Sequence, residues 1–208
     1  MPPIAPSKIV CVGRNYAAHA AEFGNQVPTE PLLFLKPPSA LVGAGEAIVL
    51  PAGAGRVDYE GEIGVVIGAR ARRVSPEAAW DHVAALVPVN DVSARDFQKK
   101  DGQWTRAKGF DTFCPVGTPV PVAGLDLAAL AVTTRVNGRV CQEALASAMV
   151  FDIPFLVAYI SGIMTLEPGD LICTGTPDGV GPLAAGDEVE VHVAGAGSVK
   201  NPVREEAA

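Results

Sequence analysis

The sequence predicts a mostly β-stranded fold of the α+β class, with a few short helices and one main domain. The 208 residues include 22 glycines and 18 prolines that are spread along the chain, which indicates many turns between short elements. Apolar residues make up 49% of the chain and charged residues 19%, so wholesale disorder is excluded and a sizeable core is expected. The clearest apolar run, residues 63–67, is almost entirely β-branched, as is typical of strands.

The first half of the chain is expected to form strands separated by two helices. Asn15 can cap a helix over residues 16–23, which Gly24 would stop. A second helix is expected over residues 76–82, leading into a buried strand. The apolar segments predict strands at residues 8–12, 32–35, 47–50, 57–67 and 84–90.

The second half contains the longest expected helix. Asp152 can cap a helix over residues 153–166, with Pro154 tolerated in its first turn. Asn137 and Gly138 predict a type I′ hairpin turn between two strands. The expected strands lie near residues 113–116, 131–137, 139–143, 171–174 and 187–193, and residues 203–208 are expected to fray.

Two glutamates one residue apart, Glu60 and Glu62, interrupt the apolar strand 57–67. Side chains alternate on a strand, so both carboxylates point to the same face. Burying them unpaired would cost several kcal/mol each, and a hard divalent cation such as Mg²⁺ would neutralise them. The alternative is a solvated sheet face.

Asp91 is the candidate third ligand, because it follows the strand expected at residues 84–90. Strand ends often carry functional groups, although an Asp there can also be a helix N-cap or an Asx-turn residue. Three carboxylates suit Mg²⁺, which keeps positions open for substrate oxygens. A structural zinc site is not indicated, since the sequence has no His–Cys cluster.

His19 and Glu22 are three residues apart on the first helix and share one face. A carboxylate beside an imidazole suits a general base, and a surface ion pair is the alternative. Lys108 lies in a turn-rich segment, where it is suited to anchor an anionic oxygen or to remain solvated. The other two histidines, His82 and His192, have no acidic partner at useful spacing and are interpreted as structural.

A glycine-rich segment, residues 174–181, follows the strand expected at 171–174. The backbone amides around Gly175 and the Thr176 hydroxyl can form a nest for a carboxylate, or the segment is simply a hairpin loop. It lacks the Gly-Lys-Ser/Thr ending of a P-loop, which disfavours nucleotide binding.

Charge and composition limit the partners and the compartment. The net charge is −7 and no basic run exceeds two residues, so nucleic-acid binding is not expected. The four cysteines are far apart and lie in apolar segments, as expected for reduced core residues. No signal peptide or bilayer-spanning run is visible, so a soluble cytoplasmic protein without a membrane partner is predicted.

Six short motifs follow one another along the chain. They are Gly-Arg-Asn-Tyr-Ala-Ala-His at 13–19, Leu-Phe-Leu-Lys-Pro at 33–37, Tyr-Glu-Gly-Glu at 59–62, Asn-Asp-Val-Ser-Ala-Arg-Asp at 90–96, Lys-Gly-Phe-Asp-Thr at 108–112 and Thr-Gly-Thr-Pro at 174–177. In this order they resemble the fumarylacetoacetate hydrolase family, and in particular its short, single-domain acylpyruvate hydrolase-like members. The resemblance runs from about Lys8 to Val203. It divides the chain into an N-terminal extension (1–7), one catalytic domain (8–203) and a tail (204–208).

The resemblance implies a mixed β-sheet roll, a homodimer, and one Mg²⁺ or Mn²⁺ per subunit. By position it assigns the metal to Glu60, Glu62 and Asp91, the water-activating dyad to His19 and Glu22, and the stabilisation of substrate oxygens to Lys108. It also places Arg14, Gln98 and Thr176 among the substrate contacts.

The activity implied by the resemblance is hydrolysis of the C–C bond of an acylpyruvate or related 2,4-dioxo acid to pyruvate and a carboxylic acid. The same metal-dependent enolate chemistry also serves oxaloacetate decarboxylases and 2-hydroxyhepta-2,4-diene-1,7-dioate isomerases, which the motifs do not separate from hydrolases. A third interpretation is a non-catalytic metal-chelating or ligand-binding domain.

Overall fold

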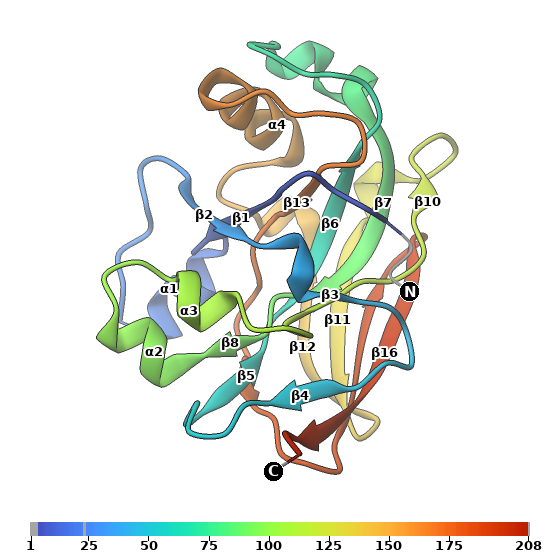
Figure 1. Cartoon of the computed structure of the whole chain (residues 1–208). Coiled ribbons are helices and arrows are strands. Elements are labelled where there is room, and N and C mark those ends of the chain that lie inside the picture. Colours follow the sequence, from blue (N-terminus) through green and yellow to red (C-terminus); the bar gives the residue numbers. More distant parts are fainter. Residues whose placement is uncertain (1–3, 23, 208) are drawn as a thin grey trace.

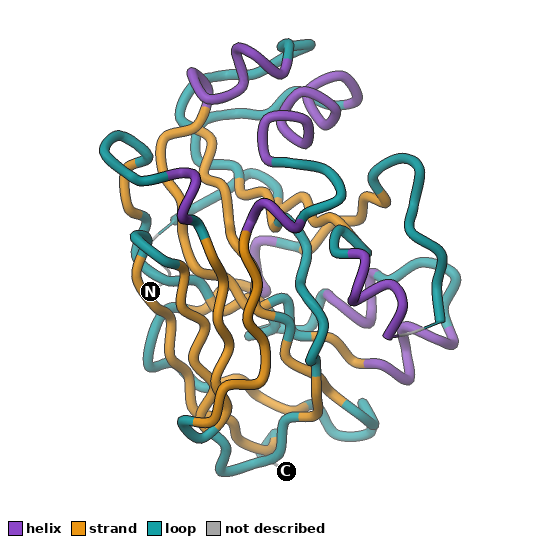
Figure 2. Tube along the Cα trace, turned by 180° about the vertical axis from the view of Figure 1, so that it is seen from behind, coloured by secondary structure: helices purple, strands orange, loops and turns teal. Residues whose placement is uncertain are grey.

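The computed structural model describes residues 4–22 and 24–207, which form a β roll with short helices at its edges (Figure 1). Two large sheets pack against each other, and two small sheets complete the roll. Seen from behind, the long strands lie side by side in the lower part of the molecule, while helical segments gather at the top and along one side (Figure 2). The predicted mostly β fold is confirmed.

The six-stranded sheet carries the candidate site. Among the described residues, its one parallel pair is β1–β13, in which Cys11 lies opposite Cys173. The strands, in spatial order, are β10 (Val120–Pro121), β7 (Val83–Asn90), β6 (Gly61–Ile67), β13 (Leu171–Cys173), β1 (Ile9–Gly13) and β2 (Leu32–Lys36).

The five-stranded sheet closes the other side of the roll. The turn between its first two strands has positive φ at both Asn137 and Gly138, as the predicted type I′ turn requires. The strands, in spatial order, are β12 (Arg139–Leu145), β11 (Ala131–Val136), β15 (Glu188–Val193), β16 (Gly197–Glu205) and β4 (Ile48–Leu50).

The two small sheets lie beside the site. One joins β14 (Gly181–Pro182), β5 (Val57–Tyr59) and β8 (Ser93–Ala94), and the other pairs β3 (Leu41–Val42) with β9 (Cys114–Pro115). The predicted strand 57–67 is therefore divided at Glu60, so that β5 and β6 belong to different sheets.

Alternation along the strands sorts side chains between two cores. On β6, Ile63 and Val65 enter the core between the large sheets, whereas Val66 enters a second core that includes residues of β3 and β9. Glu62 lies on the same face of β6 as Val66. The acids of the E-x-E pair thus face away from the main core.

The helices are short. Helix α4 (Ile153–Ile163) begins at Asp152, whose Oδ1 accepts a hydrogen bond of 2.9 Å from the Phe155 amide, and it packs on the main core. The other α-helices are α1 (Ala17–Glu22), α2 (Arg95–Lys100) and α3 (Thr105–Lys108). Within the described ranges, 3₁₀ turns span Pro38–Ala40, Pro76–His82, Leu127–Ala129 and Ala146–Ala148. None of the helices in the described part of the chain is long and apolar enough to cross a bilayer.

Several boundaries and elements differ from the sequence prediction. Helix α4 ends at Ile163 rather than 166, and residues 76–82 form a 3₁₀ helix. The prediction that residues from 203 onward fray is wrong for 203–205, because β16 extends to Glu205 and pairs with β4. Helices α2 and α3 were not predicted.

Candidate active site and metal centre

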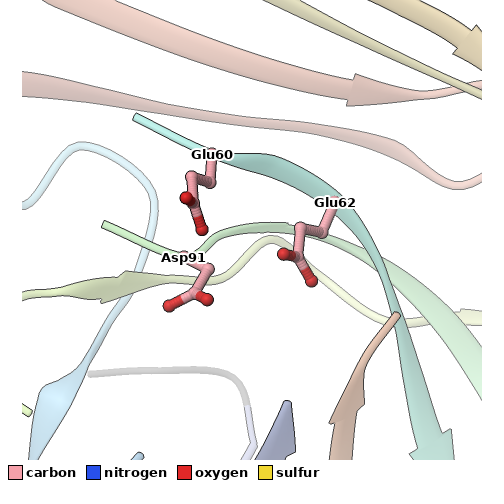
Figure 3. A group of neighbouring side chains, drawn as sticks. All are labelled: Glu60, Glu62 and Asp91. Atoms are coloured by element: carbon pink, nitrogen blue, oxygen red, sulfur yellow. The ribbon is translucent and has the colours of Figure 1, made fainter. Parts of the chain in front are cut away.

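Glu60, Glu62 and Asp91 converge on one point beside the six-stranded sheet (Figure 3). One carboxylate oxygen of each lies within 4.8 Å of the others. The hairpin pairing of β6 with β7 creates this proximity, because Gly61 lies opposite Asn90 and Asp91 follows directly. The Asp91 amide then donates a 2.8 Å hydrogen bond to the Glu60 carbonyl oxygen and fixes the two chains at this point.

The three carboxylates are buried: Glu60 is 4%, Glu62 2% and Asp91 1% exposed. The alternative of a solvated sheet face is therefore wrong. Burial, and then the negative charges of Asp91 and Glu60, raise the pKa of Glu62 well above its ordinary value. Within the described residues Glu62 forms no ion pair, and its carboxylate accepts one 2.8 Å hydrogen bond from the Gly175 amide.

Buried cations compensate the other two acids. The Lys108 ammonium lies 2.6 Å from both Glu60 Oε2 and Asp91 Oδ2. Lys36 lies 2.7 Å from Asp91 Oδ1, and Arg95 lies 2.6 Å from Glu60 Oε1. Burial alone would raise the pKa of Glu60, but Lys108 and Arg95 hold it well below its usual range. Lys108 is not the solvated lysine that the sequence left possible.

Lys108 ends helix α3 and faces both acids. Burial alone would lower the pKa of Lys108, yet Asp91 and Glu60 raise it above its ordinary value, so the ammonium stays charged at neutral pH. Its Nζ also lies 4.9 Å from the centre of the Phe34 ring, within range of a cation–π contact.

His19 and Glu22 meet on helix α1 as predicted. His19 Nδ1 lies 3.3 Å from Glu22 Oε2, and the imidazole is largely buried while Glu22 is partly exposed. The dyad is therefore more enclosed than a surface ion pair. Glu22 Oε1 also accepts a 3.2 Å hydrogen bond from the Gly179 amide, which ties helix α1 to the glycine-rich segment.

The glycine-rich segment supports the acids directly. The sequence predicted that backbone amides around Gly175 can bind a carboxylate. In the described structure the Gly175 amide donates to the carboxylate of Glu62, a residue of the protein itself. The Thr176 hydroxyl donates a 2.9 Å bond to the Gly61 carbonyl oxygen and accepts a 2.8 Å bond from Gln142 Nε2. Gly175 has φ of +101°, and a Cβ there would lie 2.7 Å from Asn15 Cβ, so glycine is required.

One pocket of about 310 Å³ brings the candidates together. Eight of the ten predicted site residues line it: Arg14, His19, Glu60, Glu62, Asp91, Gln98, Lys108 and Thr176. Phe34 and Trp104 form an apolar wall, with ring centroids 5.2 Å apart. Arg14 has φ of +58°, an uncommon conformation for a residue with a side chain, and Gln98 Oε1 accepts a 2.8 Å bond from Arg95. Glu22 and Gly175 do not line the pocket, but each contacts a residue that does: Glu22 contacts His19, and the Gly175 amide donates to Glu62.

Two charged residues of the site, Lys36 and Arg95, had no role predicted from the sequence. Arg95 bridges Glu60 and Asp58, at 2.6 Å and 2.8 Å, and so links the small sheet containing β5 to the site. Both residues lie within motifs noted in the sequence, but only the fold shows which acids they meet. A charged residue at the end of an apolar strand was the available signal for Lys36.

The donor set fits a hard divalent cation. Three carboxylate oxygens in close proximity match the preference of Mg²⁺ and Mn²⁺ for oxygen ligands. A bound cation would compensate Glu62 in particular. Burial and neighbouring negative charges raise the pKa of this carboxyl, and no cation of the described chain contacts it directly. The Glu60, Glu62 and Asp91 group is thus suited to hold the metal.

Comparison with known proteins identifies the family. A family model described as fumarylacetoacetate (FAA) hydrolase C-terminal matches residues 8–204. The chain belongs to the fumarylacetoacetate hydrolase family. It is 45% identical to the mitochondrial oxaloacetate tautomerase FAHD1 of Bos taurus over 197 residues, which cover 92% of this chain and 89% of the relative.

Solved structures of the family share the same fold. A 2-hydroxyhepta-2,4-diene-1,7-dioate isomerase from Mycobacterium marinum has a TM-score of 0.91 and 49% identity, covering 100% of this chain and 78% of that one. A fumarylpyruvate hydrolase from Pseudomonas aeruginosa, in complex with Mn²⁺ and pyruvate, has a TM-score of 0.92 and 30% identity, covering 98% and 91%. Members of this family are enzymes, and these relatives include a tautomerase, an isomerase and a hydrolase.

Proposed function

We propose that this protein is a divalent-metal-dependent enzyme that hydrolyses the C–C bond of an acylpyruvate or related 2,4-dioxo acid, giving pyruvate and a carboxylic acid. The observation that carries the proposal is one pocket lined by a buried carboxylate triad, a histidine and a charged lysine. The Mn²⁺ and pyruvate bound to the fumarylpyruvate hydrolase relative support both the metal and the product.

Glu60, Glu62 and Asp91 would hold Mg²⁺ or Mn²⁺. The bound ion would act as a Lewis acid that polarises the oxygens of a 2-oxo acid and stabilises the negative charge that develops on them. Lys108 adds a fixed ammonium beside the same carboxylates, and it donates hydrogen bonds to substrate oxygens as their charge grows.

The His19–Glu22 dyad supplies the base. Glu22 accepts from Nδ1 of His19, which leaves Nε2 as the basic nitrogen. His19 takes a proton from water, and the resulting hydroxide attacks the distal carbonyl carbon of the substrate. Collapse of this adduct breaks the C–C bond to the pyruvate part and releases the carboxylic acid. The electron pair of the broken bond leaves on the enolate of pyruvate, which takes the proton back from His19 to give pyruvate. Arg14, Gln98, Gly175 and Thr176 complete the proposed substrate-binding set, of which Gly175 acts through Glu62.

The second candidate is proton transfer or decarboxylation without attack by water. Its support is sequence identity: 45% with an oxaloacetate tautomerase and 49% with a dienedioate isomerase, against 30% with the hydrolase. Oxaloacetate decarboxylation belongs to the same group of reactions, because it also places negative charge on a 2-oxo oxygen.

The two candidates differ in their need for activated water. With Mn²⁺ present, pyruvate release from a panel of acylpyruvates and fumarylpyruvate is compared with decarboxylation and tautomerisation of oxaloacetate. His19→Ala is expected to lower hydrolysis by about 10²- to 10⁴-fold and to leave decarboxylation largely intact. His82→Ala, outside the pocket, is the control. An equal fall in both activities would contradict this division of roles.

Metal removal separates an enzyme from a binding domain. Treatment with EDTA should abolish turnover, and added Mg²⁺ or Mn²⁺ should restore it. A protein that turns over none of these 2-oxo acids, with or without metal, would contradict the proposed function.

We also propose a homodimer in the cytoplasm. Several large apolar side chains are exposed, among them Leu35 on edge strand β2 and Phe155 and Ile163 on α4, which is compatible with a subunit contact. Sedimentation equilibrium tests the oligomeric state, and cell fractionation tests the location.

A further inference from the structure

Lys36 is a charged side chain sealed inside the protein next to the triad. It is the last residue of β2 and lies opposite Ile9 of β1, so the sheet itself fixes its place. Its side chain has 0% exposed area. The ammonium donates to Asp91 Oδ1 at 2.7 Å and to the Val92 carbonyl oxygen at 3.2 Å.

Stability alone does not account for a lysine at this position. Its strand neighbour Ile9 belongs to an apolar core, where a side chain such as methionine would pack without desolvating a charge. Replacing a buried ion pair by apolar groups is often neutral or stabilising, because removing two charges from water costs more than their attraction returns. The arrangement therefore points to a role for the Asp91 carboxylate rather than for the fold.

Lys36 does not reach the substrate. Unlike Lys108, it is absent from the lining of the pocket. The two lysines contact different oxygens of Asp91: Lys36 holds Oδ1, while Lys108 bridges Oδ2 and Glu60 Oε2. Lys36 thus holds the Asp91 oxygen that Lys108 does not contact, and any effect on chemistry must pass through Asp91.

We propose that Lys36 is a positioning residue of the metal centre. It holds Oδ1 so that Oδ2 of Asp91 faces Glu60, and its charge offsets part of the repulsion among the three acids. This inference rests on the proposed metal-dependent function. Groups that orient metal ligands in this way typically contribute 10- to 100-fold to metal affinity.

The test measures Mn²⁺ affinity rather than turnover, from the electron paramagnetic resonance signal of free Mn²⁺. Lys36→Met removes the charge and the hydrogen bond while keeping an unbranched apolar side chain. It is expected to weaken Mn²⁺ binding by about 10- to 100-fold and to change the spectrum of bound Mn²⁺. An affinity within twofold of the parent protein, or a tighter one, would overturn the inference.

Lys8→Met is the matched control. Lys8 forms an ion pair with Asp170, another fully buried carboxylate, at the far end of β13 from the triad. Both variants remove a lysine from a buried aspartate, but only Lys36 contacts Asp91. The Lys8 variant is expected to keep the parent Mn²⁺ affinity. An equal loss of affinity in both variants would show a general structural effect and overturn the inference.

If Lys36→Met alone does not fold, the same substitution is made in an Asp91→Asn background. Asp91→Asn removes the carboxylate charge that would otherwise be left buried without Lys36, so the double variant still tests the inference. The double variant is expected to bind Mn²⁺ within twofold of Asp91→Asn, since Lys36 acts through that carboxylate. A further tenfold loss would overturn the inference. Failure of the parent protein to bind Mn²⁺ would instead contradict the proposed function, so the two failures are distinguishable.

Discussion

Glu62→Gln offers the sharpest test of the site, because it should stabilise the metal-free protein while damaging metal binding. The Glu62 oxygen lies within 4.8 Å of an oxygen of Glu60 and of Asp91. At an effective dielectric constant of about 20, two unit charges at this separation repel by about 3.5 kcal/mol. Lys36, Lys108 and Arg95 offset much of that repulsion through their contacts with Glu60 and Asp91.

The remaining repulsion sets the expected magnitude. Removing the Glu62 charge should stabilise the metal-free protein by about 1–2 kcal/mol, which corresponds to a rise in Tm of about 2–8 °C. Mn²⁺ at about a hundred times its Kd should stabilise the parent protein by about 2.7 kcal/mol, and the variant by far less. Thermal unfolding with EDTA and with Mn²⁺ measures both effects, and Glu143→Gln on exposed strand β12 is the control.

The pH dependence gives the same prediction a second measurement. Because the pKa of Glu62 is raised in the folded protein, the folded state binds this proton more tightly than the unfolded chain does. Stability of the metal-free parent should therefore fall as pH rises from the ordinary value of 4.5 through the raised folded pKa, and the variant should lack this contribution. A lower Tm for metal-free Glu62→Gln, or equal stabilisation of both proteins by Mn²⁺, would refute the reasoning.

Three further perturbations test the site and its support. Lys108→Met should lower kcat by about 10²- to 10³-fold, because Lys108 lines the pocket and stabilises the charge that develops on substrate oxygens; an unchanged kcat would contradict its assigned role. Asp170→Asn should lower the free energy of unfolding, measured in urea at neutral pH, by about 2–4 kcal/mol, because the carboxylate accepts hydrogen bonds from Ser7, Lys8 and Glu167. The pKa of Asp170 is lowered in the folded protein, so the stabilisation is present above the ordinary pKa of 3.8 and is lost as pH falls through the folded pKa. Gly64→Ala places a Cβ 2.5 Å from Val89 Cγ2 and should cost about 1–3 kcal/mol and weaken Mn²⁺ binding, whereas Gly162→Ala, which meets open space, should not.

The acids of the site were predictable because their placement follows from local rules. Glu60 and Glu62 share a face by strand alternation, and Asp91 lies at a strand end. The charges that surround them were not predictable in the same way. Lys36 meets Asp91 across 55 residues, and Lys108 meets Glu60 across 48, so only the register of the sheets brings these pairs together.

Strand β16 and helices α2 and α3 were not predicted from the sequence, and each case has a physical reason. In β16, the buried residues Val199, Asn201 and Val203 alternate with period two, but Lys200 and Pro202 between them weaken the strand pattern. Its pairing with β15 and β4 stabilises it despite this weak propensity. Helices α2 and α3 are short and mostly polar, so packing beside the site rather than apolar periodicity defines them.

The position of the triad argues against a purely structural role for a cation held there. A structural ion is enclosed by protein ligands, whereas a catalytic one keeps positions open to substrate. Here Glu60, Glu62 and Asp91 all line the pocket, together with Lys108 and His19. The protein side of the same acids is filled by Lys36 and the Gly175 amide, whereas Arg95 lines the pocket with the acids. A cation held there would have a fixed charge behind it and a small-molecule pocket in front, which is the arrangement that stabilising negative charge on a bound 2-oxo acid requires.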